Sequence, residues 1–224
     1  MAFRMSAEAW RERVRKFNAT NIPEDFLVAW IDHESGGNPA SLGAPTEVGI
    51  FQIDLQDGPR FGGTMETLHT NFAPYGSQKA TRALTDAEKD LQVTTGLAMV
   101  RAYVDRAKSH ASSVGADWPM GSSDFWKLVK WQHALPAYSL PLLKLFTSEN
   151  GRTPTTFDEW AAWVNARPTR PSFVSERYWN TGGKGLEKYF RNAQKVGAYG
   201  GGERLLSTWL PLVVVFVLLY MLGR

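Results

Sequence analysis

The stretch "AWIDHESGGNPASLGAPTEVGIFQIDLQDG", residues 29–58, runs from an apolar segment through one glutamate into a glycine-rich loop and a second apolar patch. Trp30 and Ile31 precede Glu34 by four and three residues, so on a helix the three side chains share a face. Apolar neighbours disfavour an ionised carboxyl group and keep it protonated, as a general acid requires. The segment therefore predicts a catalytic acid at Glu34; a solvated glutamate at a helix end is the alternative.

Helical periodicity starts upstream of this segment. Trp10, Val14 and Phe17 fall on one face of an amphipathic helix near the N-terminus, which lacks the apolar core of a signal peptide. Asn21 is a candidate cap for the helix that ends at Glu34, with a proline in its first turn.

The clearest helix signal covers residues 85–110, where Thr85 and Glu88 have the spacing of a capping box. Further amphipathic helices are expected within residues 122–139, 155–166 and 185–199. We find no strand ladder and no internal repeat. The pattern predicts a mainly α fold over residues 5–198.

Composition narrows the function. The chain has 224 residues, 43% of them hydrophobic, which suits one globular domain. A net charge of +3 is too small to indicate nucleic-acid binding. The absence of cysteine excludes disulfides and thiol catalysis, and the four histidines lack metal-site spacing, so we expect no metal and no cofactor. The nine tryptophans fit either sugar contacts or an aromatic core.

The C-terminus changes character abruptly. Residues 199–204 are glycine-rich and predict a flexible hinge, and residues 205–222 carry no charge. Eighteen residues at about 1.5 Å each span about 27 Å, close to a bilayer core. Trp209 and Tyr220 lie near the two ends, where interfacial aromatics occur. We predict a transmembrane helix at 205–222; a buried core helix is the alternative.

The residues around Glu34 resemble the first motif of the soluble lytic transglycosylases, a family of the lysozyme superfamily, and phage-encoded members look most similar. In this sequence the motif consists of Glu34, Ser35, Asn38, Pro39, Gly49, Ile50, Phe51, Gln52 and Ile53. The resemblance implies a lysozyme-like domain over residues 21–198, preceded by the N-terminal helix within 1–20. It also implies that Glu34 is the catalytic acid and base, and that Ser35 and Gln52 bind substrate.

The remaining family motifs are weaker. Residues 92–96, "QVTTG", stand where the family has a packing motif. In "WQHALP", Trp131 and Gln132 replace a tyrosine and an asparagine, and would stack on a sugar and hold its acetamido group. Tyr189, close to Glu187, resembles the last motif and is a further candidate substrate contact. The resemblance covers residues 22–196.

The resemblance implies that the chain cleaves peptidoglycan between N-acetylmuramic acid and N-acetylglucosamine and leaves 1,6-anhydromuramic ends. With the membrane segment, it predicts a phage virion protein, anchored in a virion membrane or entry apparatus beside other virion proteins. Its catalytic domain would act on periplasmic peptidoglycan during genome entry.

Two alternatives remain open. Goose-type lysozymes, structural relatives of the family, place acids where this chain has Glu47 and Asp54. A second carboxylate about 6.5–9.5 Å from the first would activate water and give hydrolysis instead. The other alternative is a catalytically inactive, glycan-binding or structural protein on the same fold, because the later motifs are degraded.

Overall fold

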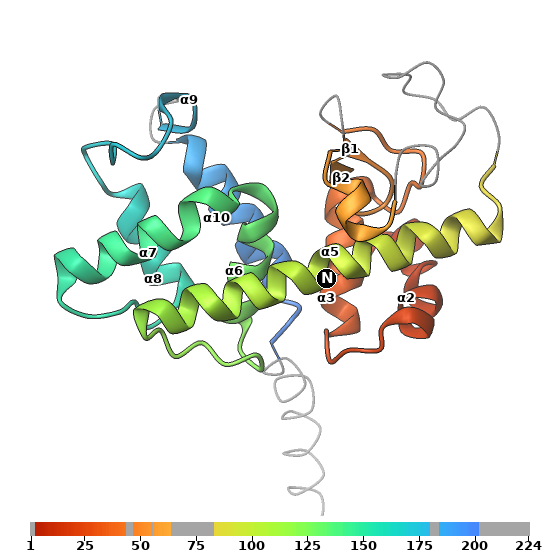
Figure 1. Cartoon of the computed structure of the whole chain (residues 1–224), viewed down its shortest axis with the longest axis horizontal. Helices are drawn as coiled ribbons and strands as arrows, with labels where there is room; N and C mark the ends of the chain where they lie inside the picture. The colour runs from red at the N-terminus through yellow and green to blue at the C-terminus, as the bar shows by residue number, and fades with distance from the viewer. Residues whose placement is uncertain (1–2, 44–46, 55, 64–82, 180–183, 202–224) are drawn as a thin grey trace, which may run out of the picture. The chain divides into compact units, whose positions relative to one another are not determined.

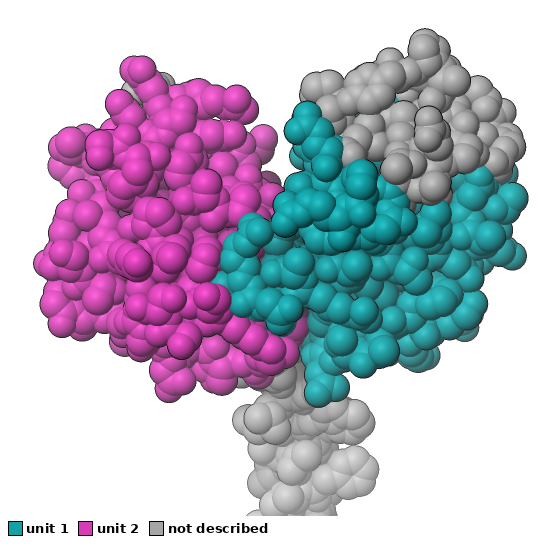
Figure 2. Space-filling view, in the orientation of Figure 1, with its two compact units in different colours: residues 1–106 teal, residues 107–224 magenta. Residues whose placement is uncertain are grey.

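The computed structural model describes residues 3–43, 47–54, 56–63, 83–179 and 184–201, and it is mainly helical, as predicted (Figure 1). The chain divides into two compact units, residues 1–106 and 107–224, coloured separately in Figure 2. Helix α5 (Asp86–Val114) begins in the first unit and ends in the second.

The first unit is built around helix α3 (Glu24–Ser35), which follows two short helices, α1 (Met5–Glu8) and α2 (Arg11–Phe17). Trp10 and Val14 of the predicted apolar face are buried, whereas Phe17 is partly exposed, and Trp10 lies between the two helices. The predicted cap at Asn21 is wrong. Asn21 is exposed and lies two residues before the cap position, which Pro23 occupies. The proline ring has no hydrogen-bonding group, so no side chain caps this helix.

A small antiparallel ribbon lies in the loop region after α3, where we expected no strand. Strands β1 (Glu47–Val48) and β2 (Ile53–Asp54) pair Glu47 with Asp54 and Val48 with Ile53. A 3₁₀ turn, η1 (Gly58–Phe61), follows. Strands of two residues are too short to show the alternation by which a strand is recognised in a sequence.

Helix α5 starts with the capping box that its sequence predicts. The Glu88 carboxylate accepts a hydrogen bond from the Thr85 amide at 2.7 Å, and the Glu88 amide donates to Thr85 Oγ1 at 3.3 Å. Both N-terminal donors are therefore satisfied. The helix continues to Val114, four residues beyond the predicted end. Its buried positions include Val93, Leu97 and Val100.

The regular secondary structure in the described part of the second unit is all helix. After α5 come α6 (Ser123–Ala134), α7 (Pro136–Asn150), α8 (Phe157–Asn165), α9 (Glu176–Trp179) and α10 (Lys184–Gly197). Its core is aromatic: Trp131, Phe157, Trp160 and Phe190 are fully buried and meet in edge-to-face or stacked pairs. These aromatic residues therefore form the core of the unit and not a surface for sugar contacts.

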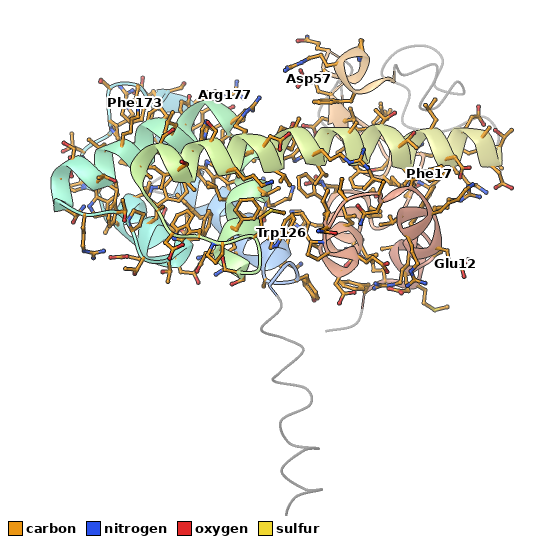
Figure 3. The ribbon with its side chains drawn as sticks, turned by 60° about the horizontal axis from the view of Figure 1, so that its bottom comes forward. Glu12, Phe17, Asp57, Trp126, Phe173 and Arg177 are labelled. Atoms are coloured by element: carbon orange, nitrogen blue, oxygen red, sulfur yellow. The ribbon has the colours of Figure 1, made fainter. Side chains whose placement is uncertain are left out.

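The start of the predicted hinge is packed. A Cβ atom at Gly200 would overlap the ring of Trp126 on α6 (Figure 3), and one at Gly201 would press on Ser123. These glycines permit close approach to α6. No helix among the described residues is long and apolar enough to cross a membrane. The predicted span 205–222 lies outside the described residues, so it stays a prediction.

Candidate functional site

Glu34 lies on the last turn of α3, between the core and solvent. Trp30 and Ile31, which share its face, are fully buried, while Glu34 itself is partly exposed. The helix ends immediately afterwards because Gly36 adopts a left-handed conformation (φ 62°) and its amide bonds to the Asp32 carbonyl at 3.1 Å. Glu34 thus follows a buried apolar face at the helix end and is itself partly exposed, and its role as a catalytic acid stays a prediction.

Ser35 joins the end of α3 to the loop that follows. Its Oγ lies 3.0 Å from the carbonyl oxygens of Ile31 and Ile50 and accepts a hydrogen bond from the Gly37 amide at 3.1 Å. These contacts hold residues 49–52 against the helix end beside Glu34. Ser35 was predicted to bind substrate; in the structure these contacts give it a positioning role.

Gln52 has an unusual backbone and a buried side chain. Its φ of 50° is the only positive value at a non-glycine residue in the described part of the chain, and such strain costs about 1–3 kcal/mol. The carboxamide is 3% exposed, and its Nε2 donates to the carbonyl oxygens of Ser41 (3.1 Å) and Gly49 (2.7 Å). Both amide hydrogens are thus used within the loop, so Gln52 fixes the loop's shape.

Gln92 on α5 opens the predicted packing segment 92–96, but the sequence analysis gave its side chain no role at the site. Its side chain is 1% exposed, its Oε1 accepts from the Ile50 amide at 3.1 Å, and its Nε2 donates to the Pro39 carbonyl at 3.0 Å. One turn later, Gly96 leaves room for the ring of Phe51, which a Cβ atom would overlap. The interpretation of residues 92–96 as a packing segment is confirmed. The sequence signal for this role is a glutamine on the otherwise apolar face of the predicted helix.

The two candidate second carboxylates face each other. Glu47 and Asp54 are directly paired across the ribbon, and both are partly exposed. Side chains of directly opposite residues project from the same face of a ribbon, where two like charges destabilise it. The Glu47 carboxylate and the Gln52 carboxamide oxygen also converge over Gly43, whose missing Cβ leaves space for both. Asp54 Oδ1 accepts from the Gln56 amide at 2.9 Å and so also shapes the turn.

Tyr103 on α5 is a second residue that the sequence analysis did not assign to the site. Its ring stacks on Trp30, with centroids 6.3 Å apart and planes 4° from parallel, and it is 7% exposed. Burial, with a smaller contribution from the negative charge of Asp57, raises the pKa of Tyr103 to about 12. Ionisation of this hydroxyl is therefore even less favourable than that of an exposed tyrosine.

The predictions for Trp131 and Gln132 are wrong. Trp131 is fully buried, stacked on Phe190 at 4.1 Å and edge-to-face with Trp160 at 5.5 Å, so no ring face is open to a sugar. Gln132 is also fully buried, and its Nε2 donates to Ser139 Oγ at 2.9 Å. The pair was chosen as an aromatic followed by a carboxamide, a pattern that a core with a polar contact satisfies equally well.

Tyr189 on α10 is partly exposed and packs edge-to-face on Tyr178, with centroids 6.0 Å apart. Its role in substrate binding stays a prediction. Tyr189, like Trp131 and Gln132, belongs to the second unit, whereas Glu34, Ser35, Glu47, Gln52 and Asp54 belong to the first. The structure thus gathers the residues of the first motif with Gln92 and Tyr103. Among the described residues no group of three or more acidic or histidine side chains could hold a metal ion.

Comparison with protein-family models, with curated proteins and with solved structures finds no match to this chain.

Proposed function

We propose that the chain is a peptidoglycan lytic transglycosylase in which Glu34 is the catalytic acid and base. The supporting observation is the set of contacts that holds the segments around Glu34 in place. Buried Trp30 and Ile31 lie behind Glu34, and the loop beside it is fastened to α3 by Ser35 and to α5 by Gln92. Preorganised surroundings of this kind are typical of catalytic groups, whereas a surface glutamate needs none.

The proposed reaction needs one proton-transfer group. Protonated Glu34 donates its proton to the glycosidic oxygen as the bond from that oxygen to C1 of N-acetylmuramic acid breaks. The carboxylate then takes the proton of the muramyl 6-hydroxyl, whose oxygen attacks C1 and closes the 1,6-anhydro ring. No water is consumed, and Glu34 ends protonated, ready for the next bond.

In the same proposal, residues 205–222 anchor the chain in a lipid membrane and the protein travels in a phage particle. This part rests on the sequence: an uncharged segment with aromatic residues at both ends. Mass spectrometry of purified particles tests it. Particles that clear cell walls in a zymogram and contain this chain support the proposal, and particles without the chain refute it.

The test of the chemistry compares Glu34→Gln with the unmodified chain on purified peptidoglycan sacculi. Glutamine keeps the size of the side chain and removes its proton, so we expect the cleavage rate to fall by about 10²–10⁴-fold, the usual contribution of a general acid. Asp25→Asn is the matched control, because Asp25 is an exposed carboxylate at the other end of α3. Equal loss in both variants, or no loss in Glu34→Gln, refutes the assignment.

Hydrolysis by a second carboxylate is the alternative reaction, and the facing pair Glu47 and Asp54 favours it. Two acids on directly opposite strand positions place a second carboxylate within the loop region that follows Glu34. Mass spectrometry of the released muropeptides separates the reactions, since anhydro ends are one water lighter than hydrolysed ends. Hydrolysed ends that disappear in Glu47→Gln or Asp54→Asn establish a muramidase. A folded chain that releases nothing supports the inactive glycan-binding protein.

A further inference from the structure

A pocket lies in the second unit, at the C-terminal end of α8. It has a volume of about 150 Å³, and its walls come from the end of α8, the following turn, α9 and the start of α10. A shallower hollow of about 300 Å³ adjoins it and shares Arg167 and Pro168.

Aromatic and hydrogen-bonding side chains share the walls of the pocket. Tyr178 and Trp179 contribute two partly exposed rings, Asn165 an exposed carboxamide and Arg167 a guanidinium group. Leu186 adds apolar surface. A ligand that fits these walls needs an apolar face for the rings and hydrogen-bonding groups at its edge.

Neighbouring side chains hold the aromatic wall in place. Tyr178 packs edge-to-face on Tyr138 (5.7 Å) and on Tyr189 (6.0 Å), while the guanidinium of Arg177 lies 4.8 Å from its ring centre. Tyr189, which the sequence predicted to contact sugar, therefore supports the wall of this pocket. A rigid ring loses little entropy when a ligand binds.

The charge of Arg167 is already neutralised. Both terminal nitrogens bond to the Glu149 carboxylate, with Nη2 to Oε1 at 3.0 Å, and the guanidinium lies 4.5 Å from the ring centre of Trp163. The salt bridge holds the pKa of Glu149 below its usual value, so the pair stays ionised at neutral pH. A paired arginine presents little net charge to an anion, and this favours an uncharged polar ligand over a phosphate or carboxylate.

We infer that this pocket binds an N-acetylated amino sugar, the repeating unit of peptidoglycan glycan strands. The acetamido methyl group and one face of the sugar ring pack on Trp179 and Tyr178. The acetamido oxygen and nitrogen, or a ring hydroxyl, bond to Asn165 at the rim. This inference extends the proposed function by giving the second unit a glycan-holding site, and it rests on the proposed substrate class.

The experiment measures hydrogen–deuterium exchange of the full chain with and without N,N′,N″-triacetylchitotriose. Glu34→Gln is present throughout, so that the ligand is not consumed. We expect slower exchange in peptides from residues 163–179 at saturating ligand. Cellotriose, which has the same linkage without acetamido groups, gives little protection there. Absence of protection in 163–179, or equal protection by cellotriose, overturns the inference.

Two variants sharpen the result. Trp179→Ala removes one ring from the pocket. We expect the ligand concentration that gives half-maximal protection in residues 163–179 to rise by about ten-fold. Phe173→Ala is the matched control, because Phe173 is an aromatic side chain of the same segment, 40% exposed and outside the pocket walls (Figure 3). An equal effect in the two variants refutes the pocket. If Trp179→Ala does not fold, the exchange data on the chain that keeps Trp179 still decide whether the pocket binds the sugar.

Exchange protection and sacculus cleavage together distinguish failure of this inference from failure of the proposed function. Protection within residues 29–58 reports ligand at Glu34, and protection within 163–179 reports ligand at the pocket. Sacculus cleavage by the chain with Glu34 intact is measured separately. Cleavage without protection at 163–179 refutes the pocket alone, whereas protection at 163–179 without cleavage refutes the transglycosylase alone.

Discussion

Gln92→Leu tests the claim that α5 holds the loop beside Glu34. The substitution keeps a buried side chain of similar size and removes the hydrogen bonds to the Ile50 amide and the Pro39 carbonyl. Losing a hydrogen bond whose carbonyl can turn to water costs about 1 kcal/mol, whereas a buried amide left without a partner costs about 1–3 kcal/mol in all. Ile50 is 1% exposed, so its amide cannot recruit water, whereas Pro39 is partly exposed and its carbonyl can. The expected loss is about 2–4 kcal/mol.

Thermal unfolding followed by circular dichroism gives the magnitude. For a chain of this size 1 kcal/mol shifts the midpoint by about 2–4 °C, so the midpoint of Gln92→Leu falls by about 5–15 °C. Hydrogen exchange within residues 49–54 becomes faster, and sacculus cleavage drops although Gln92 is remote from the proton transfer. Thr94→Ala, on the exposed side of the same helix, is the control and shifts stability by less than about 0.5 kcal/mol. A midpoint within about 1 °C of the unmodified chain refutes the reasoning.

Three further outcomes are expected. Gly96→Ala gains up to about 1 kcal/mol of helix propensity but loses about 1–3 kcal/mol by displacing the fully buried ring of Phe51. It therefore lowers the thermal midpoint, and a raised midpoint contradicts this packing. Trp131→Ala empties a fully buried site and costs about 3–5 kcal/mol in thermal unfolding. Weaker sugar binding at unchanged stability would return Trp131 to the substrate site. The hydrogen bond from Arg152 lowers the pKa of Glu159 to about 2, from a usual 4.5. Its stabilisation is complete above about pH 4.5 and is lost as the pH falls toward 2, a dependence that Arg152→Gln flattens in melting curves.

The helices were predictable because their causes are local. The face of Trp30 and Ile31 that leads to Glu34, and the capping box of Thr85 and Glu88, depend on residues three or four positions apart. Asn21 shows the limit of the same approach. A cap needs a suitable side chain at the position where the chain turns, and Pro23 decided that position.

The contacts around Glu34 were less accessible to sequence analysis. The ribbon of Glu47 and Asp54 has strands of two residues, too short for a periodic signal. The bonds from Gln92 join residues 42 and 53 positions apart. No local rule couples positions at such separations, so the fastening of the loop appears only when α5 packs on it.

Composition and neighbours within one helical turn were enough to predict the helical class, the buried face of Trp30 and Ile31, the start of α5 and the absence of thiol chemistry. Tertiary packing sets which polar and aromatic residues face inward. It made Gln52 and Gln92 the fasteners of the loop, moved Trp131 and Gln132 from the predicted sugar site into the core, and placed Tyr103 against Trp30. A tryptophan or glutamine has the same letter whether it is buried or exposed, because burial depends on the packing of distant segments.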